Sequence, residues 1–235
     1  MKTKLSFLSL FAFLLIAGTA LAQSTETRNL DSFDGISVSS GISATLVKGN
    51  TNKIEITASG IDLDKITTNV SDDKLKVRVK QNNWNKLFGN KKRKVEVTIT
   101  YNSALEYISS TAGSRVEADH TIASKDLEIK TSSGANLKLD IEADDVEVDV
   151  SSGAWASLSG FASSVGIDIS SGASLDASGL ESAEVEVDGS SGSSVKVHAT
   201  KALTVDVSSG ASVAYKGNPG TTDFDKSSGG SVRKI

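Results

Sequence analysis

Cysteine is absent from this 235-residue chain, and proline occurs once. Without cysteine no disulfide bond can form, so stability must come from packing and backbone pairing alone. The lipid-attachment route of exported bacterial lipoproteins also needs a cysteine, and we therefore expect no lipid anchor. Aromatic residues make up only 5% of the chain, whereas glycine occurs 20 times and Ser, Val and Asp are frequent. This composition is typical of strands joined by Ser/Gly turns and not of helical or disordered chains.

An excess of basic residues is also lacking. The chain has 25 Lys and Arg against 29 Asp and Glu, a formal net charge of −4. Proteins that bind nucleic acid in bulk neutralise its phosphates with an excess of Lys and Arg. We therefore expect no nucleic-acid partner.

The first 22 residues have the pattern of a secretory signal peptide. Lys2 and Lys4 precede an apolar stretch from Leu5 to Ala17, and the small-x-small pattern that signal peptidase cleaves follows at residues 20–22. We expect export and a mature chain that begins near Gln23. Because no later segment approaches the roughly 18 apolar residues of a membrane span, we expect no transmembrane segment. The predicted location is the periplasm, the outer surface or the medium.

The tripeptide Ser-Ser-Gly, or a variant of it, occurs seven times between residues 111 and 229. Its glycines are Gly113, Gly134, Gly153, Gly172, Gly192, Gly210 and Gly229, with spacings of 21, 19, 19, 20, 18 and 19 residues. Apolar residues alternate with polar ones on both sides of the glycine, as at Val148 and Val150 before it and Ala154, Ala156 and Leu158 after it. Each repeat thus predicts two short strands and two turns, with one buried face.

A unit of about 19 residues is too short to fold alone, so stacking of units must bury its apolar side chains. Propeller blades are about twice as long, and leucine-rich repeats have a different pattern. Residues 109–235 are therefore predicted to form an all-β, parallel β-helix, which the crossover rule makes right-handed. Residues 23–108 are predicted to be a less regular, strand-rich part or the first rungs, because Ser39-Ser40-Gly41 repeats the turn once.

Three phrases of the sequence resemble the head GIN domain family. They are SSGISATLVKGN (residues 39–50), KVEVTITY (residues 94–101) and the later SSGA runs. The resemblance covers residues 30–235, which we expect to form one domain of this type. It implies a parallel β-helical fold and a role in the cell envelope, since the family is described as auto-transporter adhesins and is common in the Bacteroidetes.

A column of carboxylates is the first candidate site. One aspartate stands four residues before the turn glycine in five successive rungs, at Asp149, Asp168, Asp188, Asp206 and Asp225. Strand alternation predicts that these side chains point outward together with the serines two residues later. An oxygen-rich ladder can bind Ca²⁺ or a cationic partner. It can equally cap turn N–H groups, or form a solvated face that blocks edge aggregation, and we expect no resident cofactor.

Two groups of aromatic residues are further candidates. Trp155 stands two residues after its glycine, where other rungs carry Asn or Ser, so an outward indole could stack on a sugar ring or pack under a loop. The segment from Lys80 to Lys94 places Trp84 among Lys91, Lys92 and Arg93. Such a segment could contact lipid phosphates or an acidic polysaccharide, or be a solvated hairpin tip.

Signals of catalysis are weak. His120 and His198 are predicted to lie four rungs apart, which excludes a shared metal site, and no nucleophile, phosphate-loop or zinc motif is present. A polysaccharide lyase or hydrolase would need one carboxylate pair set apart from the regular column. The sequence therefore predicts a non-catalytic, adhesin-like envelope protein that binds a glycan, a surface polymer or a partner protein. The alternative is a structural, self-assembling solenoid.

Overall fold

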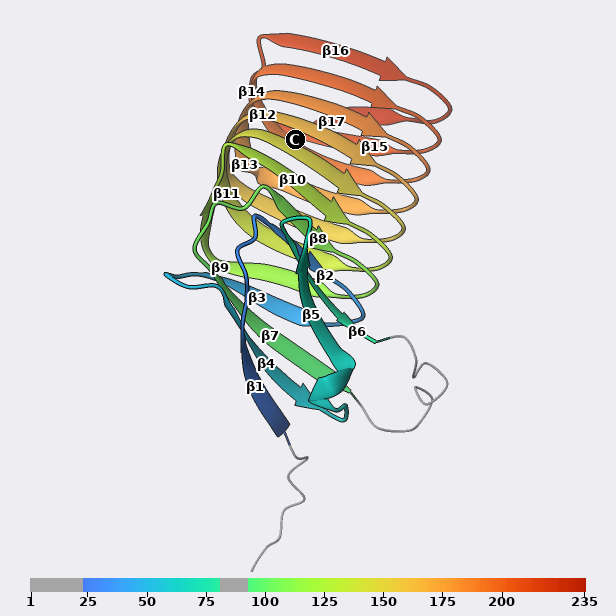
Figure 1. The fold of residues 1–235 in the computed structure, drawn as a ribbon. Coiled ribbons are helices and arrows are strands. Elements are labelled where there is room, and N and C mark those ends of the chain that lie inside the picture. Colours follow the sequence, from blue (N-terminus) through green and yellow to red (C-terminus); the bar gives the residue numbers. More distant parts are fainter. Residues whose placement is uncertain (1–22, 81–92) are drawn as a thin grey trace, which may run out of the picture.

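The computed structural model describes residues 23–80 and 93–235, which form an all-β solenoid of about seven turns (Figure 1). One short 3₁₀ helix, η1 (Leu63–Lys65), accompanies seventeen strands that belong to one continuous sheet. The strands are β1 (Gln23–Asn29), β2 (Gly35–Val38), β3 (Ser43–Lys48), β4 (Lys53–Ser59), β5 (Ile66–Ser71), β6 (Lys74–Val79), β7 (Lys94–Tyr101), β8 (Tyr107–Ser110), β9 (Arg115–Ala123), β10 (Asp126–Thr131), β11 (Asn136–Val150), β12 (Trp155–Ile169), β13 (Ser174–Gly189), β14 (Ser194–Val207), β15 (Ser212–Lys216), β16 (Thr221–Lys226) and β17 (Ser231–Lys234). The predicted fold class is confirmed.

The central strands β11 to β14 are longer than the repeat predicts. Residues 136–142 of β11 pair in parallel with β9, and residues 145–150 of the same strand pair in parallel with β10. One strand thus lies on two sides of the solenoid and forms nearly a whole rung between the turns at Gly134 and Gly153. In β11 to β14 the predicted second turn is wrong, because the chain bends there without leaving the ladder, whereas a break does separate β9 from β10 and β15 from β16. In β11 the bend lies at Asp144 and Asp145, two consecutive exposed residues that shift the alternation by one.

The Ser-Ser-Gly segments are the sharp turns. Ser152 and Gly153 have φ angles of 53° and 66°, and the amide of Ala154 donates a 3.1 Å hydrogen bond to the carbonyl of Ser151. Two successive positive φ angles define a type I′ turn, whose twist suits the strands it joins. The amide of Gly153 also donates a 3.0 Å hydrogen bond to the carbonyl of Ser171 in the next rung, so the turns stack as a ladder of their own.

The apolar side chains of successive rungs stack into one core. Val150, Ile169 and Val207 are buried and share one interior column. The continuous cluster of buried residues extends from Phe33 to Val213, which covers both the regular rungs and the N-terminal part. Stacking therefore buries the apolar side chains that a single rung would leave exposed.

The N-terminal part contains both a regular rung and a cap. β2 and β3 flank a turn at Ser40 and Gly41 that stacks on the next turn, because the Gly41 amide donates a 3.0 Å hydrogen bond to the carbonyl of Ala112. β6 and β7 lie on the other side of this rung, although they follow it in the chain. β4 then pairs antiparallel with β7, β1 with β4, and β5 with β6, so antiparallel strands close this end. Within residues 23–80 and 93–235, no helix is long and apolar enough to cross a membrane.

Candidate functional site

The solenoid has two broad faces, which the turns separate. We call the outward side of β6, β2, β8, β10, the second halves of β11 to β14 and β16 the pre-turn face, because these strands lead into the turns. The post-turn face is the outward side of the strands that follow the turns, namely β7, β3, β9, the first halves of β11 to β14, β15 and β17. The two faces carry different side chains, and each holds candidate residues.

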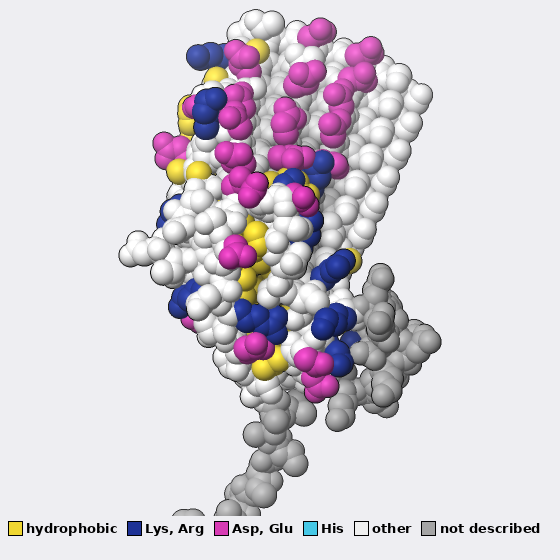
Figure 2. Space-filling view, viewed as in Figure 1, with side chains coloured by type: hydrophobic (Ala, Val, Ile, Leu, Met, Phe, Trp, Pro, Cys, Tyr) yellow, Lys and Arg dark blue, Asp and Glu magenta, His cyan; other side chains and the backbone are white. Residues whose placement is uncertain are grey.

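The pre-turn face is acidic from β10 to β16. Figure 2 shows the carboxylates in columns over the upper part of this face, with Lys and Arg side chains below them. The acids that the strand register places here are Asp126, Glu128, Asp145, Glu147, Asp149, Asp168, Glu184, Glu186, Asp188, Asp206, Asp223 and Asp225. Residues 109–235 contain 10 Lys and Arg against 19 Asp and Glu, a formal charge of −9, whereas residues 23–108 contain 13 against 10. The acidic field therefore belongs to the regular rungs.

The five candidate aspartates form one exposed column in consecutive rungs, as their spacing predicts. Asp149, Asp168, Asp188, Asp206 and Asp225 are partners in the parallel register. The first four line an open groove of about 380 Å³ together with three serines of the turns. Desolvation, followed by the charges of Asp168, Glu186 and Asp206, raises the pKa of Asp188. Among the described residues, no three Asp, Glu, His or Cys side chains are grouped as a metal centre requires.

Trp155 lies on the post-turn face at the first residue of β12. Its indole is 41% exposed, and its register partners on the two neighbouring strands are Asn136 and Ser174. The same column continues with Ser194, Ser212 and Ser231. The indole therefore points outward from the post-turn face.

The second exposed aromatic residue of β12 was not expected from the sequence. Phe161 is 47% exposed, and its register partners are Glu142 on β11 and Glu181 on β13. It follows Gly160, which has a φ of 109° and lies so close to Ile141 that an added Cβ would overlap the Ile141 carbonyl oxygen. The signal in the sequence was a large apolar residue directly after a glycine within a run of serines.

The basic segment before β7 lies mostly outside the described residues. This applies to Trp84, Lys91 and Lys92, whereas Arg93 is described and is half-buried. The neighbouring Lys94 forms a 2.8 Å ion pair with Glu96 on the same strand. Of these four candidates, Arg93 is thus the one within the described residues, and it lies directly before the start of β7.

Sequence reasoning also missed a polar cluster near the N-terminal end, in which Tyr101 is buried, His120 is half-buried and Asp119 is exposed. The Tyr101 hydroxyl lies 2.8 Å from Nε2 of His120, and Nδ1 of His120 lies 2.6 Å from a carboxylate oxygen of Asp119. Burial, together with the Asp119 charge, raises the pKa of Tyr101 to about 12. A hydroxyl that holds its proton this firmly is a poor nucleophile. The three groups satisfy one another and stabilise the fold.

Comparisons with known proteins agree with this architecture. A family model described as "Putative auto-transporter adhesin, head GIN domain" matches residues 32–219. A crystal structure of a putative adhesin from Bacteroides fragilis superposes with a TM-score of 0.82 at 17% identity, covering 92% of this chain and 98% of that one.

Two further crystal structures superpose over nearly the whole chain. A putative adhesin from Parabacteroides merdae gives a TM-score of 0.70 at 18% identity and covers 91% of this chain and 96% of that one. A putative lipid binding protein from Parabacteroides distasonis gives 0.69 at 16% identity, with the same two coverages. At these identities the likeness shows the fold alone. A search of curated proteins found no match.

Proposed function

The chain belongs to the head GIN domain family of auto-transporter adhesins and has an adhesin-like function, and on this basis we propose that it is an exported, non-catalytic envelope protein that binds a glycan through Trp155. The signal-peptide pattern of residues 1–22 supports export, although these residues lie outside the described structure. The adhesin description of the family suggests an extracellular or surface location.

The exposed indole of Trp155 is the observation that carries the proposal. The exposed ring keeps apolar surface in contact with water. Covering it with the apolar side of a sugar ring removes that surface from water, which is favourable. Asn136, Ser157 and Ser174 surround it with uncharged donors and acceptors. An apolar ring with a few polar groups around it is the common design of sites that orient a small ligand. A neutral glycan fits this site, because the charges nearest in the register, Lys138 and Asp176 on either side of Ser157, have opposite signs.

A non-catalytic role is supported by the arrangement of the acids. A glycoside hydrolase needs two carboxylates at a defined separation, one of them with a strongly raised pKa in a cleft. The aspartates form a regular, exposed column, in which the neighbours of Asp188 are alike on both sides. The Tyr101 hydroxyl is not an accessible nucleophile, since the Tyr101 side chain is only 2% exposed.

A glycan array with the mature chain, residues 23–235, tests the proposal. We expect the wild type to bind a subset of neutral glycans and Trp155→Ala to lose that binding by about tenfold or more. Phe161→Ala is the matched control, since it removes the other exposed ring of the same strand, and it should bind like the wild type. Absence of glycan binding by the wild type, or equal binding by Trp155→Ala, would contradict the proposal.

A further inference from the structure

The surroundings of Phe161 differ from those of Trp155 in charge. In the parallel register the ring lies between two outward glutamates, Glu142 on one side and Glu181 on the other. Adjacent strands are about 4.8 Å apart, which places both glutamates directly beside the phenylalanine in the sheet. All three side chains are exposed. The result is an aromatic surface with a negative group on each side.

Neither glutamate is neutralised by a neighbour within the described part of the chain. Among those residues the Glu142 and Glu181 carboxylates take part in no hydrogen bond or ion pair, whereas Glu128 is paired with Lys130 at 2.7 Å. Three residues further along the same two strands stand Asp145 and Glu184, which begin the acidic pre-turn face. The ring therefore lies at the edge of a continuous acidic surface.

We propose that Phe161, Glu142 and Glu181 form a docking site for a lysine or arginine side chain of an extended basic segment in a partner protein. A cation above an aromatic face is attracted by the ring quadrupole, and the two carboxylates add charge-assisted hydrogen bonds. Further basic residues of the segment then lie over Asp145 and Glu184. The acidic field of the regular rungs steers such a partner toward the surface.

The same three residues disfavour other occupants. An apolar partner would take two carboxylates out of water without pairing them, which is costly. A neutral glycan would stack on the ring but leave both charges uncompensated. A metal ion would need more oxygen ligands than these two carboxylates supply. This site is separate from that of Trp155, so either proposal can fail while the other stands.

The sheet itself supplies a matched control. On the same three strands Glu147 and Glu186 flank Gly166, in the register in which Glu142 and Glu181 flank Phe161. The double variant Glu147→Gln/Glu186→Gln thus removes the same charge from the same strands without touching the aromatic site. Phe161→Ala removes the ring and leaves every charge in place.

The probe is a fluorescein-labelled peptide of alternating Lys and Gly, and anisotropy titrations at constant ionic strength give its dissociation constant. We expect Phe161→Ala to weaken binding about two- to fivefold, the size of a cation–π attraction at an exposed site. Glu142→Gln/Glu181→Gln should weaken binding more than Glu147→Gln/Glu186→Gln. Trp155→Ala should bind the peptide like the wild type.

Three results would overturn the inference. They are no binding of the peptide by the wild type at low salt, no effect of Phe161→Ala, or equal losses in the two glutamate double variants. The last result would mean that the whole acidic face attracts the peptide without a specific site. Circular dichroism and a thermal melt of each variant check that the sheet is intact, and these exposed positions leave the core unchanged.

Discussion

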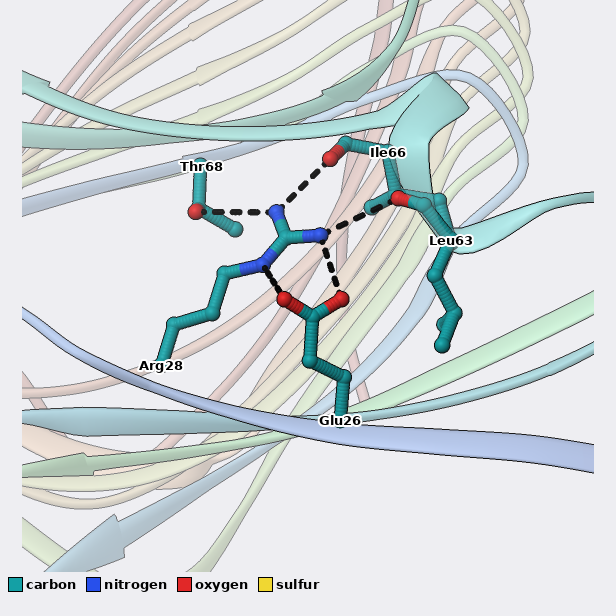
Figure 3. A network of polar contacts seen from close by, with 5 residues as sticks. All are labelled: Glu26, Arg28, Leu63, Ile66 and Thr68. Carbon is teal, nitrogen blue, oxygen red and sulfur yellow. Dashed lines mark hydrogen bonds and ion pairs between the residues drawn. The ribbon is translucent and has the colours of Figure 1, made fainter.

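The guanidinium of Arg28 in β1 donates a 2.7 Å hydrogen bond to the carbonyl of Ile66 at the start of β5 (Figure 3). It also donates to the carbonyl of Leu63 and to the carboxylate of Glu26. β1 is the outermost strand of the series β7, β4, β1, and β5 is the outermost strand next to β6. A single side chain thus ties the two sheet edges together at the N-terminal end.

Replacement of Arg28 should loosen this cap. We expect Arg28→Met to lower the free energy of unfolding by about 2 kcal/mol, because two carbonyls and a carboxylate lose a charged donor. Arg28→Lys should recover only part of this, since one ammonium cannot reproduce the fork of the guanidinium. Urea unfolding measures the difference.

The control for this cap is Lys53→Met. Lys53 forms an exposed ion pair with Glu55 on β4, and such pairs contribute about 0.5 kcal/mol or less. Equal losses for Lys53→Met and Arg28→Met would show that Arg28 acts as an ordinary surface charge and does not hold the two edges together.

We expect the turn glycines to be required because of their positive φ angles, and not because a side chain there would clash with neighbouring atoms. Gly153 has a φ of 66°, and an added Cβ there would meet no atom within 4 Å. Gly153→Ala should therefore cost about 1–2 kcal/mol, the penalty of a left-handed residue with a side chain. Thermal melts of Ser152→Gly provide the comparison.

Ser152 is already left-handed, with a φ of 53°, so a glycine there relieves strain and should leave stability the same or raise it by a few tenths of a kcal/mol. A loss in Ser152→Gly as large as that in Gly153→Ala would contradict this account of the turn.

The regular rungs were predictable because each turn needs the same backbone conformation and each strand the same alternation. Aligning the chain on Gly153 and its equivalents also places Asp168 and Asp188 side by side, since neighbours in a parallel ladder keep their register. The N-terminal cap was not predictable in this way. β4 and β7 alternate like the other strands, yet they pair antiparallel with each other, and nothing in their side chains reports direction.

The site was only partly predictable, for a related reason. Trp155 stands out because its position relative to the turn glycine can be compared between rungs. Phe161 lies beyond the register shift between β12 and β13, where the lengths of the rungs differ, so no such comparison was possible. Tyr101 and His120 come from strands separated by β3, and their contact depends on the order of rungs in space.

Stability should respond to pH through Asp188. Its pKa is raised in the folded state by desolvation and by the neighbouring acids, so the folded protein holds this proton more tightly than the unfolded chain does. The carboxylate therefore destabilises the fold above its folded pKa, and the penalty disappears as the pH falls below the unfolded value. Asp188→Asn should stabilise by a few tenths of a kcal/mol at neutral pH and low salt, since the group is largely solvated.

The gain from Asp188→Asn should vanish near pH 3, where the wild-type carboxyl is protonated as well. Asp225→Asn is the control. Asp225 has only Asp206 beside it in the described column, so its replacement relieves less repulsion. Equal gains in the two variants, or a gain that persists at pH 3, would contradict repulsion along the column.

Divalent cations should act on the same column as counter-ions. We expect millimolar Ca²⁺ and Mg²⁺ to raise the Tm equally and no more than sodium chloride of the same ionic strength, since both screen the repulsion. A calcium site built from Asp149, Asp168, Asp188, Asp206 and Asp225 would instead give a saturable rise with Ca²⁺ alone, because Mg²⁺ demands a tighter octahedral shell. Differential scanning fluorimetry with Asp188→Asn as the reference separates the two outcomes.

Self-association should be held back by lysines at the last rung. Lys226 in β16 is the register partner of the buried Val207, and Lys234 in β17 is the partner of Tyr215, so both lysines stand in columns that are interior in the preceding rungs. A charge at such a position disfavours the addition of another strand to a sheet edge. We expect Lys226→Val/Lys234→Val to form concentration-dependent oligomers in sedimentation velocity, while the wild type and Lys216→Val remain small. Filaments of the wild type under the same conditions would favour the self-assembling solenoid over a binding protein.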